Sequence, residues 1–93
     1  MATVYLNGHY LPDDKALISP LDRGFTYGDG VYEWIRAYNG KPFLLKEHFA
    51  RLASSCAKMR IGLYVTPLEE VPARLLRENA LTGDAAIYIQ VTR

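Results

Sequence analysis

Two Asn-Gly pairs, each between segments rich in β-branched and aromatic residues, constrain this chain more than any other feature. Asn-Gly is strongly preferred in two-residue hairpin turns because both residues tolerate a positive φ. Asn7-Gly8 lies inside "TVYLNGHYL", and Asn39-Gly40 separates "VYEWIRAY" from "KPFLL". We therefore expect two antiparallel hairpins, one at the start of the chain and one near its middle.

The strand before the second Asn-Gly has two different faces. Side chains alternate along a strand, and this gives two sets of four residues. The sets are Val31, Glu33, Ile35 and Ala37 on one face, and Tyr32, Trp34, Arg36 and Tyr38 on the other. Because both faces mix apolar and charged groups, we expect one to cover a core and the other to border a polar cavity or a second domain.

A helical period follows. Apolar residues recur at spacings of three and four, which is typical of an amphipathic helix over residues 46–60 that stops at Gly62. This stripe consists of Leu45, Phe49, Leu52, Cys56 and Met59.

A second helix is signalled by "TPLE" at residues 66–69, which resembles a capping box with proline at the first helical position. Pro72 would interrupt that helix, so we expect either a kink or a later start. Gly83-Asp84 closes the segment, and the alternating "AAIYIQVTR" predicts a half-buried strand. The expected fold class is α+β, an antiparallel sheet with two helices packed on it.

Composition narrows the class of protein further. The chain has 93 residues, a net charge of +1 and one cysteine, and 49% of its residues are hydrophobic. These values favour a single small globular domain and give no basic stripe for nucleic acid. No stretch approaches the roughly 20 apolar residues that span a bilayer. We therefore expect neither nucleic-acid nor membrane partners, and a cytoplasmic location that suits an unpaired Cys56.

The stretch "DRGFTYGDGVYE", residues 22–33, is the densest in glycine. It does not fit a Walker loop because no Gly-Lys-Ser/Thr follows, and it does not fit the dinucleotide fingerprint because Glu33 occupies the third glycine position. Two interpretations remain open: the glycines permit turns before the strand, or the stretch forms part of a ligand pocket. Tyr27, between glycines, would be presented to a cavity more easily than buried.

Arg51 is the strongest candidate for binding an anion. It lies roughly 120° from the centre of the apolar stripe, at 100° per helical residue, so periodicity alone favours a solvated arginine. A guanidinium fork nevertheless matches two phosphate oxygens. His48, at the edge of the stripe, is better explained as a boundary residue than as a base. No acidic or cysteine partner stands at metal-ligand spacing from it or from His9.

The chain resembles the N-terminal domain of the fold type IV pyridoxal-phosphate enzymes, and within them the D-amino acid (D-alanine) aminotransferases. The resemblance is carried by the order of five motifs over nearly the whole chain. These are Asp-Arg-Gly, Tyr-Gly-Asp-Gly-Val-Tyr-Glu, an Asn-Gly hairpin, His-x-x-Arg-Leu and Tyr-Ile-Gln-Val-Thr-Arg.

The resemblance implies roles for five residues. Arg51 would bind the phosphate of pyridoxal 5'-phosphate (PLP). Tyr32 would hydrogen-bond the substrate carboxylate, and Tyr27 would face the substrate, either in its own subunit or across a homodimer interface. Glu33 and His48 would support the cofactor contact without touching the substrate. The glycine-rich stretch would then be both a turn and a pocket wall, which lets Tyr27 and Tyr32 reach inward.

The resemblance also implies that parts of the enzyme lie elsewhere. The family's cofactor-binding lysine and the acid that pairs with the pyridine nitrogen belong to a C-terminal domain, so no catalytic residue is expected within residues 1–93. We expect a fragment, or a natural truncation, of a two-domain enzyme that acts on amino acids and 2-oxo acids. A branched-chain aminotransferase, an aminodeoxychorismate lyase and a non-catalytic module that dimerises or binds a partner chain remain as alternatives.

Overall fold

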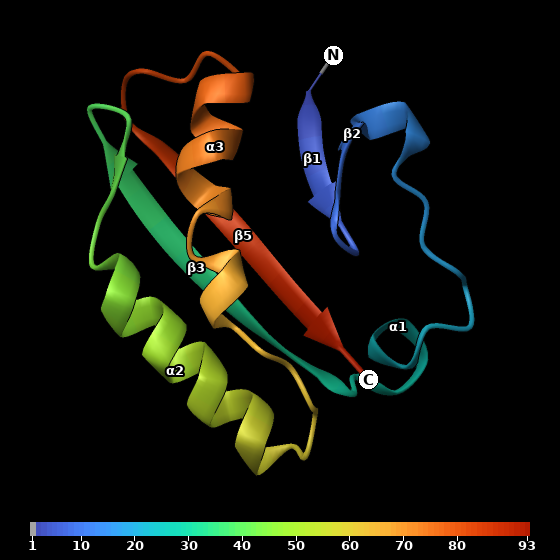
Figure 1. Cartoon of the computed structure of the whole chain (residues 1–93). Helices are drawn as coiled ribbons and strands as arrows, with labels where there is room; N and C mark the ends of the chain where they lie inside the picture. Colours follow the sequence, from blue (N-terminus) through green and yellow to red (C-terminus); the bar gives the residue numbers. More distant parts are fainter. Residues whose placement is uncertain (1) are drawn as a thin grey trace.

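The structure is a computed structural model that describes residues 2–93. Two pairs of consecutive strands are each followed by helical segments, and one more strand follows the last helix (Figure 1). In order they are β1 (Thr3–Leu6), β2 (His9–Pro12), the 3-10 turn η1 (Asp13–Lys15), α1 (Arg23–Tyr27), β3 (Gly30–Tyr38), β4 (Lys41–Pro42), α2 (Leu45–Lys58), the 3-10 turn η2 (Thr66–Leu68), α3 (Val71–Glu78) and β5 (Ala85–Thr92).

Both predicted hairpins are confirmed, with Asn-Gly at each turn. The φ angles are 50° and 90° at Asn7 and Gly8, and 52° and 74° at Asn39 and Gly40. The hairpins lie in different sheets, because β1 pairs with β2 alone whereas β3 lies between β4 and β5. The predicted final strand is β5, which pairs antiparallel with β3 along its whole length, from Gly30 opposite Thr92 to Ala37 opposite Ala85.

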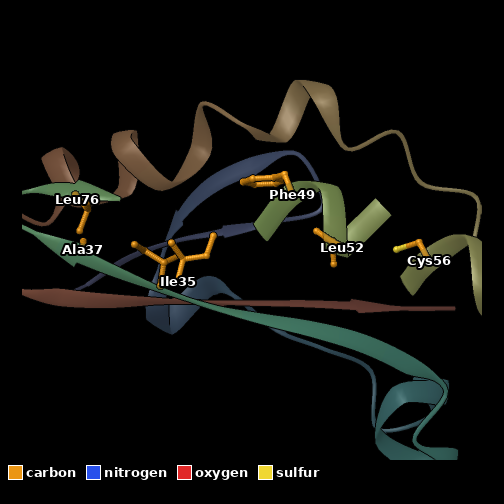
Figure 2. Close-up of a cluster of buried hydrophobic side chains, with 7 residues drawn as sticks. Ile35, Ala37, Phe49, Leu52, Cys56 and Leu76 are labelled. Carbon is orange, nitrogen blue, oxygen red and sulfur yellow. The ribbon is translucent and has the colours of Figure 1, made fainter. Parts of the chain in front are cut away.

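The two faces of β3 divide as the alternation predicts. Glu33, Ile35 and Ala37 are buried, whereas the residues between them are exposed. Helices α2 and α3 cover the buried face (Figure 1). Figure 2 shows the core between sheet and helices, where Ile35 of β3 lies near Phe49 and Leu52 of α2. The α+β class, with an antiparallel sheet and two helices packed on it, is confirmed.

The first long helix ends earlier than the sequence suggested. Its last residue is Lys58 rather than Arg60, because Arg60 adopts a left-handed φ of 56°. The amide of Arg60 donates to the Ala57 carbonyl at 3.1 Å, and the amide of Ile61 donates to the Cys56 carbonyl at 2.8 Å. This pair of bonds is the Schellman motif, so the helix stops before it reaches Gly62.

The second helix starts later than its apparent capping box, which was one of the two expectations. Thr66 begins a short 3-10 turn and makes no capping bond, and α3 begins at Val71. Pro72 therefore lies in the first turn, where an amide donor is not needed. The helix ends at Glu78, and Ala80 just after it takes a left-handed φ of 54°, so the segment turns before Gly83.

Two side chains, Asn79 and Arg74, attach the first hairpin to α3 and its C-terminal end. The Asn79 amide accepts from the Thr3 amide at 2.8 Å and donates to the carbonyls of Thr3 at 2.9 Å and Leu75 at 2.8 Å. Arg74 also lies over the Tyr10 ring, 3.8 Å from its centroid. Within residues 2–93, no helix has the length and apolar character that a membrane crossing requires.

Candidate functional site

A buried carboxylate organises the candidate site. Glu33 is the charged residue on the core face of β3, and it is only 3% exposed. Both of its oxygens are bonded from α2. Arg51 donates from Nε to Oε2 at 2.7 Å and from Nη2 to Oε1 at 2.8 Å, and His48 Nδ1 lies 2.7 Å from Oε1. Since a buried charge without partners is very costly, these contacts explain how Glu33 is accommodated.

Helical spacing brings the two partners together. His48 and Arg51 are three residues apart on α2, so their side chains share one face above the first half of β3. Hydrogen bonds from Arg51 and His48 hold the pKa of Glu33 below its usual range, although burial acts in the opposite direction. Glu33 in turn raises the pKa of Arg51. Both groups are therefore charged at neutral pH.

Arg51 keeps part of its hydrogen-bonding capacity. A guanidinium has five N–H donors, and Glu33 takes one from Nε and one from Nη2. Nη1 makes no hydrogen bond to the described residues, and the side chain is 66% exposed. A pocket of about 300 Å³ adjoins it, lined by Leu44, Glu47, His48 and Arg51. The outer edge of the fork can thus receive two oxygens of an anion.

The two predicted substrate tyrosines lie elsewhere on the surface. Tyr32 projects from the opposite face of β3, is 64% exposed and stacks on Tyr88 with ring centroids 5.9 Å apart. Tyr27 ends α1, is 75% exposed and lies under the Arg23 guanidinium at 4.9 Å. Neither phenol lines the pocket at Arg51. The structure thus brings Arg51, Glu33 and His48 together, and leaves Tyr27 and Tyr32 facing solvent.

The first part of the glycine-rich stretch forms a one-turn helix, α1, which its sequence pattern did not predict. Asp22 caps it by accepting from the Gly24 amide at 2.8 Å, and Thr92 Oγ1 donates to the same carboxylate at 3.0 Å. A Cβ on Gly24 would lie 2.0 Å from Thr92 Cγ2, and one on Gly30 would lie 2.6 Å from the Val91 carbonyl oxygen. These glycines therefore allow the stretch to pack closely on the end of β5.

Sequence reasoning missed the two aspartates of this stretch, Asp22 and Asp29. Asp22 carried a usable signal, since aspartate is a preferred helix N-cap. Asp29 carried none, because one of its partners, Arg93, is 64 residues away in the chain.

Comparison with known proteins agrees with this architecture. Residues 30–93 match the family model of amino-transferase class IV. A D-alanine aminotransferase of Staphylococcus epidermidis is 44% identical over 95 residues, which cover 100% of this chain and 33% of that protein. A putative branched-chain-amino-acid aminotransferase of Methanocaldococcus jannaschii is 45% identical over 92 residues, which cover 97% of this chain and 32% of that protein.

A solved structure shows the same fold. The T.th. branched-chain amino acid aminotransferase, complexed with N-(5'-phosphopyridoxyl)-L-glutamate, superimposes with a TM-score of 0.85 and 32% identity over 96% of this chain and 31% of that one. The chain spans about a third of the length of the relatives it matches. The family model covers more than half of the chain, and the resemblance inferred from its motifs is confirmed: the chain belongs to the amino-transferase class IV family.

Proposed function

We propose that this chain is the N-terminal, phosphate-binding part of a PLP-dependent aminotransferase that transfers an amino group between a D-amino acid, such as D-alanine, and a 2-oxo acid. The observation that carries the proposal is the Arg51 fork, which is fixed on one edge by buried Glu33 and accessible on the other. The family and the similarity to a D-alanine aminotransferase support it.

The donor set fits a phosphate. A phosphate dianion is best bound by a planar cation held on a rigid element, and Arg51 lies in the middle of a 14-residue helix. Glu33 fixes the plane of the guanidinium, and His48 fixes Glu33 from the other side. When bound, PLP supplies the electron sink that stabilises negative charge at the substrate Cα, and the protein supplies position and charge.

The rest of the site requires surface from outside residues 2–93. All four lysines of the chain, Lys15, Lys41, Lys46 and Lys58, are exposed, so none is held in the apolar surroundings that activate an amine. The exposed aromatic face around Tyr32 is also suited to further protein surface. We place residues 1–93 as one small α+β domain of a larger two-domain enzyme that forms a homodimer. Tyr32 and Tyr27 would face the amino-acid substrate there.

Branched-chain aminotransferase is the second candidate. It is favoured by the 45% identity to the putative branched-chain relative, which matches the identity to the D-alanine aminotransferase. Sequence similarity does not separate the two. Assaying the purified full-length protein with D-alanine and with L-leucine, each with a 2-oxo acid acceptor, distinguishes them. Turnover of D-alanine supports the first candidate, and turnover of L-leucine alone supports the second.

The role of Arg51 is tested by Arg51→Ala and Arg51→Lys in the full-length protein, with Arg77→Ala as the matched control. Arg77 is an exposed arginine on α3 away from Glu33. We expect both Arg51 variants to raise the dissociation constant of PLP by about tenfold or more, since a lost bidentate charge-assisted pair costs at least that factor. The Arg77 variant should bind PLP normally. Wild-type affinity for PLP in a folded Arg51→Lys variant would contradict the phosphate role.

A further inference from the structure

Arg93 joins three segments that are far apart in the sequence. Its Nε donates to Asp29 Oδ2 at 2.7 Å, and its Nη1 donates to the Arg60 carbonyl at 3.1 Å. Its Nη2 donates to the Met59 carbonyl, and its backbone amide donates to the Asp29 carbonyl at 3.2 Å. Figure 1 shows this end of β5 beside α1. One side chain thus connects β5, the bend before β3 and the end of α2.

At one end of this connection, Asp29 lies within the glycine-rich bend at residues 28–30. Asp29 lies between Gly28, whose φ is 66°, and Gly30, the first residue of β3. Its carboxylate is only 13% exposed, and it also accepts from Arg23 Nε at 3.0 Å. The two guanidinium groups hold the pKa of Asp29 below its usual range, so the carboxylate stays ionised. A bend with glycine on both sides has little stiffness of its own, and these ion pairs define its path.

The carbonyl end of the connection reaches the C-terminal end of α2. The last carbonyls of a helix lack partners within the helix, and they carry the negative end of its dipole. Met59 and Arg60 follow α2 directly, so a cation is well placed there. The same helix carries His48 and Arg51. Arg93 therefore sets the position of the bend between Tyr27 and Tyr32 relative to the helix that bears the candidate phosphate site.

We propose that Arg93 is a positioning residue, which holds the Tyr27–Gly30 segment against the end of α2 and so places both tyrosines for the amino-acid substrate. The part that concerns substrate rests on the proposed function. A guanidinium is required because three nitrogens in a fixed plane reach one carboxylate and two carbonyls at once, whereas lysine offers a single nitrogen. Arg93→Lys therefore preserves the charge and removes the connection.

The test uses the full-length protein and the variants Arg93→Lys and Asp29→Asn, with Arg77→Lys as a control for surface arginines. Hydrogen exchange gives a readout independent of activity. We expect faster exchange at the amides of residues 28–30 in both Arg93→Lys and Asp29→Asn, with unchanged protection at Leu52 in the centre of α2. Exchange at residues 28–30 identical to wild type in Arg93→Lys would overturn the proposal.

The kinetic readout separates positioning from a general structural role. In Arg93→Lys we expect KM for the amino donor to rise by about tenfold or more, because small misplacements of contact groups have effects of this size. The dissociation constant of PLP should stay within about twofold, since Glu33 rather than Arg93 orients Arg51. Equal rises in KM and in the PLP dissociation constant would overturn the proposal. A wild-type protein without transaminase activity would instead remove the proposed function, and hydrogen exchange alone would then decide the role of Arg93.

Discussion

Glu33→Gln is the most informative single substitution at the candidate site. Glutamine has the shape of glutamate but has one acceptor oxygen and one donor nitrogen. Oε1 of Glu33 accepts from Arg51 Nη2, and Oε2 accepts from Arg51 Nε. Whichever way the amide is turned, its nitrogen therefore faces an N–H of Arg51. At least one charge-assisted bond is lost, and the others become bonds to a neutral acceptor.

The expected loss in the free energy of unfolding follows from how many Glu33–Arg51 hydrogen bonds are removed and from how exposed they are. A hydrogen bond that involves a charged group contributes about 1.5–3 kcal/mol, and one such bond is removed outright. The side chain of Arg51 is 66% exposed, so water can replace part of the hydrogen bonding that its guanidinium loses. We therefore expect the free energy of unfolding to fall by about 2 kcal/mol, toward the lower end of the range.

Urea-induced unfolding at neutral pH, followed by circular dichroism, measures this change provided the denaturant slope stays constant. Glu78→Gln is the matched control, because Glu78 also pairs with an arginine, Arg74, at 3.4 Å, but both side chains are exposed. That variant should lose no more than about 0.5 kcal/mol. Equal costs for the two variants would show that burial adds nothing to the Glu33 pair and would refute the reasoning.

The pH dependence gives an independent check on the same substitution. The pKa of Glu33 is lower in the folded chain than in the unfolded chain, so the unfolded state binds more protons across the interval between the two values. The stabilisation from this difference is fully present above the pKa of Glu33 in the unfolded chain. It is lost as the pH falls through the pKa of Glu33 in the folded chain. The difference in unfolding free energy between wild type and Glu33→Gln should therefore shrink on acidification below the ordinary glutamate pKa.

Two further predictions concern the fold. Leu52→Ala removes a fully buried side chain between α2 and β3 and should cost about 2–5 kcal/mol in urea unfolding, whereas Leu17→Ala, at a position 80% exposed, should change the free energy by less than about 0.5 kcal/mol. Asn79→Ala removes three hydrogen bonds, two of which join the first hairpin to the end of α3. It should cost about 1–3 kcal/mol and speed hydrogen exchange at Thr3, and unchanged exchange there would show that the hairpin is held by other contacts.

The sequence was most predictive where one local rule acts on neighbouring residues. Asn7-Gly8 and Asn39-Gly40 identified both hairpins because positive φ is a property of those residues themselves. The period of two along β3 grouped Glu33 with Ile35 and Ala37 on one face, and the period of three to four placed Phe49 and Leu52 on the apolar side of α2. Helix ends were predicted less well, since Arg60 and Ala80 adopted left-handed conformations that glycine would have taken more readily.

Only the tertiary structure decided how the charged residues are paired. Helical periodicity placed Arg51 away from the apolar stripe of its helix. No neighbouring residue indicated that its partner is a buried carboxylate 18 residues earlier. Asp29 and Arg93, 64 residues apart, meet because β5 pairs with β3 in one particular register. Local rules act through the backbone preferences of a few adjacent residues, whereas an ion pair depends on where separate strands and helices come to lie. The sequence by itself therefore determined the elements and which residues share a face, and the packing of those elements determined which face of β3 is buried and how the site is assembled.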